Sequence, residues 1–320
     1  MCYSAQVEAG YKKYVRAWGA DISIHDFFRL YWEGASNSRI KTPKAMDTAF
    51  ADPQTDEERE IKKLIDQRNT DQVTKLELEL FKQKKRLADA ERTLQTKTTK
   101  KTLEDKRISS EKIEWALGKL GDIRRPNLVD EDSRIFPGWY APVMVMENGK
   151  RVVRPMRYQC RPAGKPAFND VKFPGTYNAR RDSLGSYWKD LFGYSHGIMI
   201  ASAFFENVSL HAMQHRELAP GEKEQNVILE FRPQPAQDML VACLWSHWKG
   251  APGEPELLSF AAITDEPPAE VAAAGHNRCI IPIKPEHIEV WLNPDPGNLA
   301  AQRAILDDRA RPYYEHKMAA

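Results

Sequence analysis

The chain has 320 residues, a formal net charge of +2 at pH 7, and a composition that is 42% hydrophobic and 29% charged. This balance is typical of a soluble globular protein with a sizeable core, and the small net charge excludes a basic surface over the whole molecule. No apolar run approaches the roughly 20 residues that span a bilayer, and residues 1–6 lack the basic and apolar regions of a signal peptide. We therefore expect a cytoplasmic protein without a membrane partner.

Cys2 becomes the amino-terminal residue when Met1 is removed. The product carries a thiol and a free α-amine on adjacent carbons, with ordinary pKa values near ~8.5 and ~8. Such an aminothiol condenses with an aldehyde, first as a Schiff base and then as a five-membered thiazolidine, and it is also a nucleophile with its own base. On position alone, an accidental cysteine in a frayed terminus is the more common case.

The segment after the first 50 residues differs in character from the rest of the chain. Residues 24–32 are rich in aromatic side chains and predict a helix, whereas acidic and basic residues crowd together from 52 to 125. We predict that 52–125 is a charged helical hairpin inserted into a single domain of residues 1–320. The hairpin would close on itself, or pair with a protein partner or a second copy; the plainer alternative is an amphipathic segment with a solvated face and no ligand.

Two sets of apolar residues support the hairpin. The first set has the 3-then-4 spacing of about three heptads, with Gln83 as its polar break, and consists of Val73, Leu76, Leu80, Leu87, Ala90 and Leu94. The second set follows a threonine-rich turn at 93–99 and consists of Leu103, Ile108, Ile113, Ala116, Leu117 and Leu120.

Short strand-like runs separated by proline and glycine dominate after residue 125. The pair Asn148-Gly149 is a strong hairpin signal, and the runs are residues 141–146, 197–205, 227–231, 239–245 and 257–264. Because strands and helices do not alternate regularly, we predict an α+β fold around an antiparallel sheet. The residues from Ala300 onward predict a helix and a tail.

The cysteines exclude two other classes of protein. Cys2, Cys160, Cys243 and Cys279 lie far apart, with no pair at the spacing of a zinc knuckle or a disulfide framework. We expect free thiols, and we expect Cys243 and Cys279 to lie in buried strands. No cofactor or metal is predicted.

Four short segments carry the strongest functional signal. In chain order they are Met1-Cys2, Asn178-Ala179-Arg180-Arg181-Asp182, Ala203-Phe204-Phe205-Glu206-Asn207, and Gly275-His276-Asn277-Arg278-Cys279-Ile280-Ile281-Pro282. Together they resemble motifs of the SRAP family (SOS response-associated peptidase-like proteins), which cap abasic sites in single-stranded DNA through an N-terminal cysteine. The resemblance covers residues 1–50 loosely and about 134–293 in register, and it implies a barrel-like core of the SRAP type.

The resemblance implies covalent capture of abasic sites in single-stranded DNA as a thiazolidine on Cys2. The adduct would protect the lesion during DNA repair. Autoprocessing would remove Met1, so the chain would combine peptidase activity with a lyase-type activity. The partner would be single-stranded DNA with abasic sites, besides any partner of the hairpin.

The resemblance also assigns roles to three residues besides Cys2. Glu206 would shuttle protons, because burial raises the pKa of a carboxyl toward neutrality. His276 would protonate the sugar ring oxygen as the ring opens, and Asn178 would hold the terminal amine or thiol by hydrogen bonds. A solvated strand-end carboxylate and a structural histidine are the ordinary alternatives for Glu206 and His276.

Three arginines in the same motifs are candidate DNA contacts. Arg180 suits a phosphate through its bidentate guanidinium. Arg181 and Arg278 would act in the same way, and a surface ion pair is the ordinary alternative for each of them.

Several positions depart from the family pattern. Tyr3-Ser4 stands where the family usually has Gly-Arg, Asp182 replaces a glutamate, and Asn207 replaces an aromatic residue. The family's tryptophan-rich loop is reduced to residues 157–162, so the DNA-binding surface matches less well than the chemical core. Two other functions therefore stay open: an amide hydrolase that uses Cys2, and a non-catalytic interaction protein that uses the hairpin.

Overall fold

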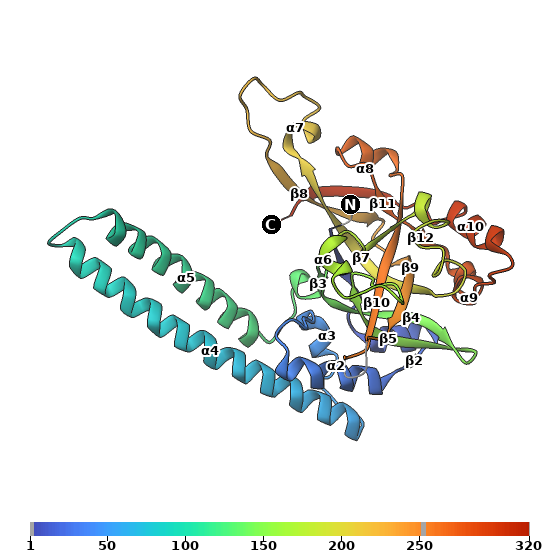
Figure 1. The fold of residues 1–320 in the computed structure, drawn as a ribbon, viewed down its shortest axis with the longest axis horizontal. Helices are drawn as coiled ribbons and strands as arrows, with labels where there is room; N and C mark the ends of the chain where they lie inside the picture. Colours follow the sequence, from blue (N-terminus) through green and yellow to red (C-terminus); the bar gives the residue numbers. More distant parts are fainter. Residues whose placement is uncertain (1–2, 251–253, 320) are drawn as a thin grey trace. The chain divides into compact units, whose positions relative to one another are not determined.

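The computed structural model describes residues 3–250 and 254–319. The chain divides into two compact units, one of Met1–Asp52 with Val129–Ala320 and the other of Pro53–Leu128 (Figure 1). The first unit contains a large sheet with short helices around it, and the second contains two long helices.

The first unit is built on one sheet of thirteen described strands. The main path of the sheet runs β12-β9-β10-β5-β4-β7-β1-β3, and the other five strands pair at its margins. The strands are β1 (Ser4–Val7), β2 (Asp21–Ile22), β3 (Arg134–Ile135), β4 (Tyr140–Glu147), β5 (Lys150–Tyr158), β6 (Asn178–Arg180), β7 (His196–Ser209), β8 (Asn226–Gln234), β9 (Met239–Trp248), β10 (Leu257–Asp265), β11 (Cys279–Ile280), β12 (Pro282–Ile283) and β13 (Tyr313–Met318).

The pairings of five strands form a closed circuit. β9 pairs with β10, β10 with β5, β5 with β4, β4 with β7, and β7 with β9 again. The core is barrel-like without being a true barrel, because β4 and β7 share one register pair, Met144 with Ile198. The predicted α+β fold with an antiparallel sheet is confirmed, since among the described strands only β2–β5, β5–β10 and β6–β10 pair in parallel.

The five predicted strand-like runs lie in β4, β7, β8, β9 and β10. β10 is buried over nearly its whole length, which explains its uninterrupted apolar run. Asn148 and Gly149 form the turn between β4 and β5 with φ values of 51° and 73°. This left-handed geometry is the one that Asn-Gly favours in a two-residue hairpin.

Short helices surround this sheet. They are α1 (Tyr11–Trp18), α2 (Ile24–Ser36), α3 (Lys44–Thr48), α6 (Asn169–Lys172), α7 (Leu210–Met213), α8 (Ala269–Ala273), α9 (Ile288–Leu292) and α10 (Leu299–Asp307), with 3₁₀ turns at Asp130–Ser133, Arg181–Ser183 and Pro285–His287. The predicted aromatic helix is α2. Its buried face meets Phe50, whose ring centroid lies 5.7 Å from that of Tyr31 and 5.1 Å from that of Tyr11.

The predicted tail after α10 is wrong in part. Residues Tyr313–Met318 form β13, which pairs with β8 in antiparallel register. Tyr314 is buried, and its ring packs edge-on against Phe204 with centroids 5.1 Å apart. One buried side chain among exposed neighbours is too short a pattern to predict a strand from the sequence of residues 313–318. The strand forms because β8 offers it a partner.

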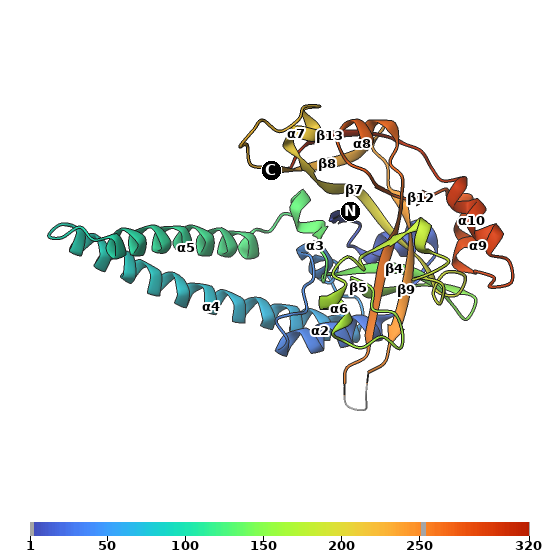
Figure 2. The same ribbon diagram turned by 45° about the horizontal axis from the view of Figure 1, so that its top comes forward.

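The second unit contains α4 (Asp56–Leu94) and α5 (Lys100–Arg124), which lie side by side (Figures 1 and 2). Thr55 and Thr99 cap their N-termini, because each side chain accepts a hydrogen bond from the backbone N–H three residues later. Ion pairs such as Arg86–Asp105, at 2.5 Å, cross between the helices. The helices therefore run antiparallel around the threonine-rich turn.

The interior of this hairpin is more polar than the apolar pattern suggests. Gln83 is buried in the seam of α4, and its Nε2 donates to Oε1 of Glu79 over 2.8 Å, while the Lys112 Nζ of α5 lies 3.6 Å from the same carboxylate oxygen. The second predicted apolar set is wrong at Leu103 and Leu117, which are exposed. The helical period instead turns Thr102, Ser109, Ala116 and Leu120 inward.

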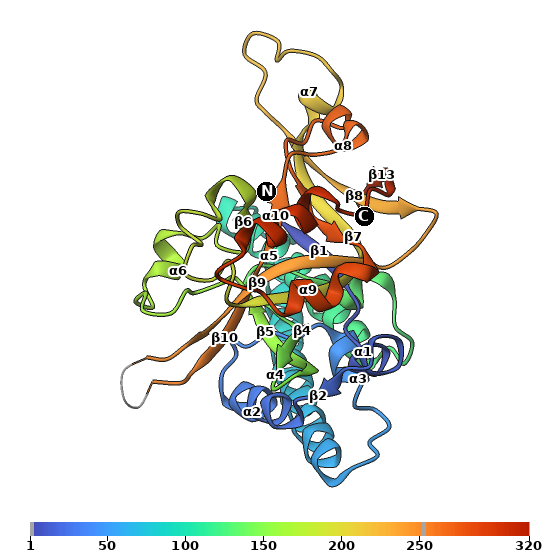
Figure 3. The same ribbon diagram turned by 90° about the vertical axis from the view of Figure 1, so that its right-hand side faces the viewer.

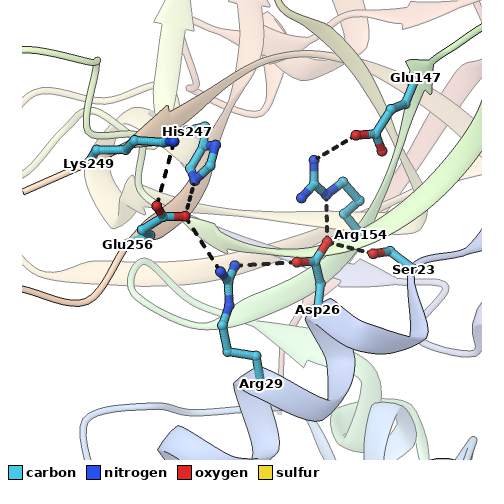
Figure 4. Close-up of polar contacts among 8 residues, drawn as sticks. All are labelled: Ser23, Asp26, Arg29, Glu147, Arg154, His247, Lys249 and Glu256. Atoms are coloured by element: carbon cyan, nitrogen blue, oxygen red, sulfur yellow. Dashed lines mark hydrogen bonds and ion pairs between the residues drawn. The ribbon is translucent and has the colours of Figure 1, made fainter.

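A polar network joins α2 to β5 and to the β9–β10 hairpin (Figure 4). Asp26, which is 6% exposed, accepts hydrogen bonds from Ser23 Oγ over 2.7 Å and from Arg154 Nε over 2.6 Å. Arg29 lies between Asp26 and Glu256, 3.4 Å from the first carboxylate and 3.7 Å from the second. This network fixes α2 on the sheet.

Asp26→Asn should destabilise the fold by about 3 kcal/mol, because it breaks a buried ion pair and leaves Arg154 with only the more distant Glu147 carboxylate, at 3.7 Å. Burial opposes the charge of Asp26, but hydrogen bonds from Arg154 and Ser23 hold its pKa below the ordinary value. This stabilisation is present above the unfolded pKa and is lost as pH falls through the folded pKa. The variant should therefore differ most from the parent near pH 7 in urea unfolding.

The matched control is Asp21→Asn. Asp21 is exposed and lies 3.8 Å from Lys150, so its removal should change the free energy of unfolding by less than about 0.5 kcal/mol. Equal losses in the two variants would contradict a specific role for Asp26.

Candidate functional site

Glu206 and His276 meet inside the first unit. Glu206 lies near the end of β7 and is 0% exposed, and His276 lies in the loop before β11 and is 7% exposed. The Nε2 atom of His276 is 3.2 Å from Oε2 of Glu206. The structure therefore brings together two of the predicted catalytic residues that are 70 positions apart in the sequence.

The hydrogen-bond partners of His276 define its tautomer. The Nδ1 atom of His276 lies 2.9 Å from the carbonyl oxygen of Arg278, which only accepts, so Nδ1 carries a hydrogen. Burial lowers the pKa of His276 to about 4. Its Nε2 faces Oε2 of Glu206, so the two side chains form a buried acid–base pair.

Gly275 sets the position of His276. It has a φ of +91°, and a Cβ atom there would lie 3.0 Å from Cγ1 of Val208 and 3.2 Å from backbone atoms of Ala212 and Met213. The end of β7, α7 and α8 lie side by side in this region (Figure 3). Only glycine fits both the left-handed backbone and this close approach.

Gly275→Ala should destabilise the protein by about 2 kcal/mol, because it adds backbone strain to a clash with the backbone of α7. The measurement is the free energy of unfolding in urea. Gly221→Ala is the control: Gly221 has a φ of +84°, but nothing lies within 4 Å of the position that a Cβ atom would take there. An equal loss in both variants would show that the contact with α7 is unimportant.

Cys2 lies outside the described residues, so its role stays a prediction. Its neighbour Tyr3 is described, and the Tyr3 N–H donates to the carbonyl of Phe205 over 3.3 Å. Ser4 pairs with Phe205 in the β1–β7 register, and Phe205 directly precedes Glu206.

Asn178 and Arg180 lie on β6, which pairs in parallel with β10. Asn178 is buried opposite Ala262, and Arg180 is exposed opposite Thr264. β11 pairs with the same Thr264 through Ile280. The second and fourth sequence motifs are therefore adjacent at the end of β10.

Arg180 is exposed and Arg278 is half-buried. Arg180 donates to Asp182 through Nε over 3.1 Å, and this hydrogen bond, with the nearby Arg278 charge, lowers the pKa of Asp182. Both side chains of the Arg180–Asp182 pair are more than half exposed, so the pair contributes little to stability, and the DNA contact of Arg180 stays a prediction.

Arg181 is held in a different way. It donates to Asp265 over 3.0 Å and to Asp307, and Arg309 binds the same Asp265. Its charge is therefore balanced by two carboxylates of the fold, and its DNA contact stays a prediction.

Arg134 was not among the predicted site residues. Its guanidinium carbon lies 3.7 Å from the ring centroid of Phe205, and its Nε donates to Ser4 Oγ over 3.0 Å. A cation therefore lies beside the first strand, although Tyr3-Ser4 lacks the arginine of the family pattern. The sequence held no local signal for it, because 130 positions separate Arg134 from Ser4 and only the β1–β3 pairing joins them.

Exposed aromatic side chains lie on both sides of β6 in the sequence. Phe168 and Phe173 precede the strand and Tyr187 follows it, and the rings of Phe173 and Tyr187 have centroids 6.3 Å apart. Sequence reasoning missed them because it sought tryptophans in residues 157–162. Such rings are suited to stacking with bases.

Residues 3–250 and 254–319 contain no group of three or more His, Cys, Asp and Glu side chains arranged to hold a metal ion. Over the same ranges, none of the helices combines the length and the apolar character that a membrane span requires. Cys160, Cys243 and Cys279 are buried free thiols, as predicted for Cys243 and Cys279.

Comparison with known proteins gives one family match. The model of the family described as "SOS response associated peptidase (SRAP)" matches residues 92–320. A search of curated proteins found no match. Among solved structures, a protein from Bordetella bronchiseptica is 16% identical with a TM-score of 0.46, over 59% of this chain and 87% of its own.

Two further solved structures are similar. A protein from Bacteroides thetaiotaomicron is 14% identical with a TM-score of 0.45, over 60% of this chain and 80% of its own. A phage-related protein from Bordetella bronchiseptica is 18% identical with a TM-score of 0.44, over 62% of this chain and 85% of its own.

Proposed function

Because the chain belongs to the SRAP family, we propose that it captures abasic sites in single-stranded DNA as a covalent adduct on Cys2. Membership of this family supports a role associated with DNA damage and an interaction with DNA. The observation that carries the proposed chemistry is the buried Glu206–His276 pair, which lies beside the strand residue that Tyr3 and Ser4 contact.

The reaction needs a free α-amine, so removal of Met1 comes first. The open-chain deoxyribose of an abasic site carries an aldehyde, and the amine nitrogen of Cys2 attacks its carbon to give a carbinolamine. Loss of water gives a Schiff base, and the thiol sulfur then adds to the same carbon. Overall one C–N bond and one C–S bond form, the C=O bond is lost, and one water leaves.

Glu206 and His276 would supply the protons that this sequence requires. Ring opening and departure of water each need a proton at a sugar oxygen, and the Glu206–His276 pair, whose side chains are 3.2 Å apart, would donate it. The amine releases a proton as the carbon–nitrogen bond forms, and the emptied pair is the base that takes it. Asn178 would orient the terminal amine or thiol through a neutral amide.

The DNA strand would be held by cations and rings around this centre. Arg180 and Arg278 would bind phosphates on one side, and Arg134 would bind a phosphate near the amino terminus. Phe168, Phe173 and Tyr187 would stack with bases. This set would replace the tryptophan-rich loop and the Gly-Arg pair of the family pattern.

The direct test is incubation of the purified chain with a single-stranded oligonucleotide that contains one abasic site. We expect an adduct that survives heating in denaturant, with a mass equal to protein without Met1 plus DNA minus one water. Intact mass before incubation tests the removal of Met1. A processed chain that forms no adduct but cleaves amide substrates would support the amide-hydrolase alternative instead.

A further inference from the structure

The turn end of the α4–α5 hairpin concentrates positive charge. Residues 82–107 contain ten basic and four acidic side chains, a net charge of +6, although the whole chain carries only +2. The basic residues lie on the last turns of α4, on the turn, and on the first turns of α5. One end of the second unit is therefore strongly cationic, and the rest of the chain is net acidic.

Six lysines in this end form no ion pair within 4.0 Å in the described part of the chain, although the charge of Lys82 contributes, after the Gln83 hydrogen bond, to the lowered pKa of Glu79. No carboxylate there lies within 4.0 Å of their ammonium groups, whereas the neighbouring Arg86, Arg92, Lys106 and Arg107 all have one. The six are Lys82, Lys84, Lys85, Lys97, Lys100 and Lys101. Their charge is not neutralised by an ion pair, so it is available to an external anion.

A groove between the two helices gathers three of these lysines. It has a volume of about 460 Å³, and Lys82, Lys85 and Lys101 line it together with Arg86 and the hydroxyl-bearing Thr93 and Thr102. Its two carboxylates are already paired, Asp105 with Arg86 at 2.5 Å and Asp89 with Arg92 at 3.2 Å. The hydroxyls are engaged within the helices, Thr93 with the Asp89 carbonyl and Thr102 with Thr99. The groove is therefore a cationic recess that offers its lysines, and it is large enough to admit a phosphodiester.

We propose that this groove, here called the lysine groove, binds the phosphate backbone of DNA. A DNA strand presents closely spaced negative charges that several lysines on adjacent helix turns contact at once. Residues 95–99 of the turn are polar, and the exposed apolar side chains Phe81 and Leu103 lie before and after them, so binding to vesicles is one of the outcomes tested below. The hairpin would thus provide a second DNA-binding site, and binding there would require neither an abasic site nor Cys2.

The test compares two triple variants of the full chain. K82Q/K85Q/K101Q removes three charges from the lysine groove, and K62Q/K63Q/K119Q removes three charges from the same helices at lysines that lie 2.7–3.7 Å from a carboxylate. The probes are a 30-nucleotide single strand and a 30-base-pair duplex, both without an abasic site. Fluorescence anisotropy at several salt concentrations gives the dissociation constants.

The quantity compared is the slope of the logarithm of the binding constant against the logarithm of the salt concentration. On single-stranded DNA we expect the groove variant to reduce the magnitude of this slope by about 2, since each lost phosphate contact accounts for about 0.7. At 0.1 M salt this corresponds to about 100-fold weaker binding, while the control triple should stay within about threefold of the parent. Matching circular dichroism spectra establish that both variants are folded.

Other results would overturn the proposal. If both triples weaken binding equally, or if neither changes it on single strands or on duplex, the lysine groove is not the DNA contact. The same holds if the groove variant keeps DNA binding but loses binding to vesicles rich in phosphatidylserine or to an acidic polypeptide. Because the probes lack abasic sites, failure of covalent capture on Cys2 would leave this test unaffected.

Discussion

Replacing Cys2 with alanine is expected to abolish the heat-stable adduct with abasic single-stranded DNA while leaving the fold intact. The Ala variant keeps an α-amine after Met1 is removed, so it still forms a Schiff base, but it has no sulfur to close the ring. Cys2→Ser should give at most a labile Schiff-base or oxazolidine product, because oxygen closes the ring less favourably than sulfur. Denaturing gels after heating, with and without borohydride reduction, separate these products.

The other cysteines do not substitute for Cys2. Burial raises the pKa of Cys160 to about 12, and it also raises the pKa of Cys243 and of Cys279, so all three stay protonated near neutral pH. Since they are also buried, they are inaccessible to a DNA strand. An undiminished heat-stable adduct from Cys2→Ala would therefore rule out the proposed chemistry.

Glu206→Gln should slow adduct formation by about 10²–10⁴-fold at saturating DNA, the usual loss for a general acid or base. The amide keeps the size of the side chain and donates a hydrogen bond to Nε2 of His276, but it cannot release a proton to the sugar. The variant still carries the aminothiol of Cys2, so it can form the adduct slowly and reach the same final yield. The measurement must therefore be the rate of adduct formation and not the final yield. His276→Ala should be slowed in the same way, whereas Arg180→Ala should mainly raise the dissociation constant.

The matched control is Glu230→Gln on the neighbouring strand β8. Glu230 is also buried, but it pairs with Arg232 and Lys317 rather than with a histidine. Glu230→Gln should form the adduct at close to the parental rate, provided that the variant is folded under the conditions of the assay. The assigned role of Glu206 fails if Glu206→Gln reaches the parental rate under saturation.

The sequence was informative where a pattern was local. The Asn148-Gly149 turn, the apolar strands and the long charged helices each follow from short-range rules, and the structure contains all of them. β13 and the parallel β6–β10 pairing were not predictable in this way. Their register is set by strands far away in the chain, so no short pattern encodes it.

The candidate site shows the same division. The order of four short motifs was sufficient to select Glu206 and His276, which the structure places in contact. It did not reveal that Nε2 is the ring nitrogen that faces Glu206, because that follows from the Arg278 carbonyl on the other ring nitrogen. No sequence pattern identified Arg134, because only the folding of the sheet brings it beside Ser4.

Gln83 has a consequence for the assembly of the hairpin. An apolar seam alone would tolerate a slip of one helix along the other, since one leucine packs much like the next. The hydrogen bond from Gln83 to Glu79 lies within α4, and it orients the Glu79 carboxylate that Lys112 of α5 meets at 3.6 Å. The Arg86–Asp105 pair matches in the same alignment, in which Lys82 and Lys85 of one helix line the same groove as Lys101 of the other.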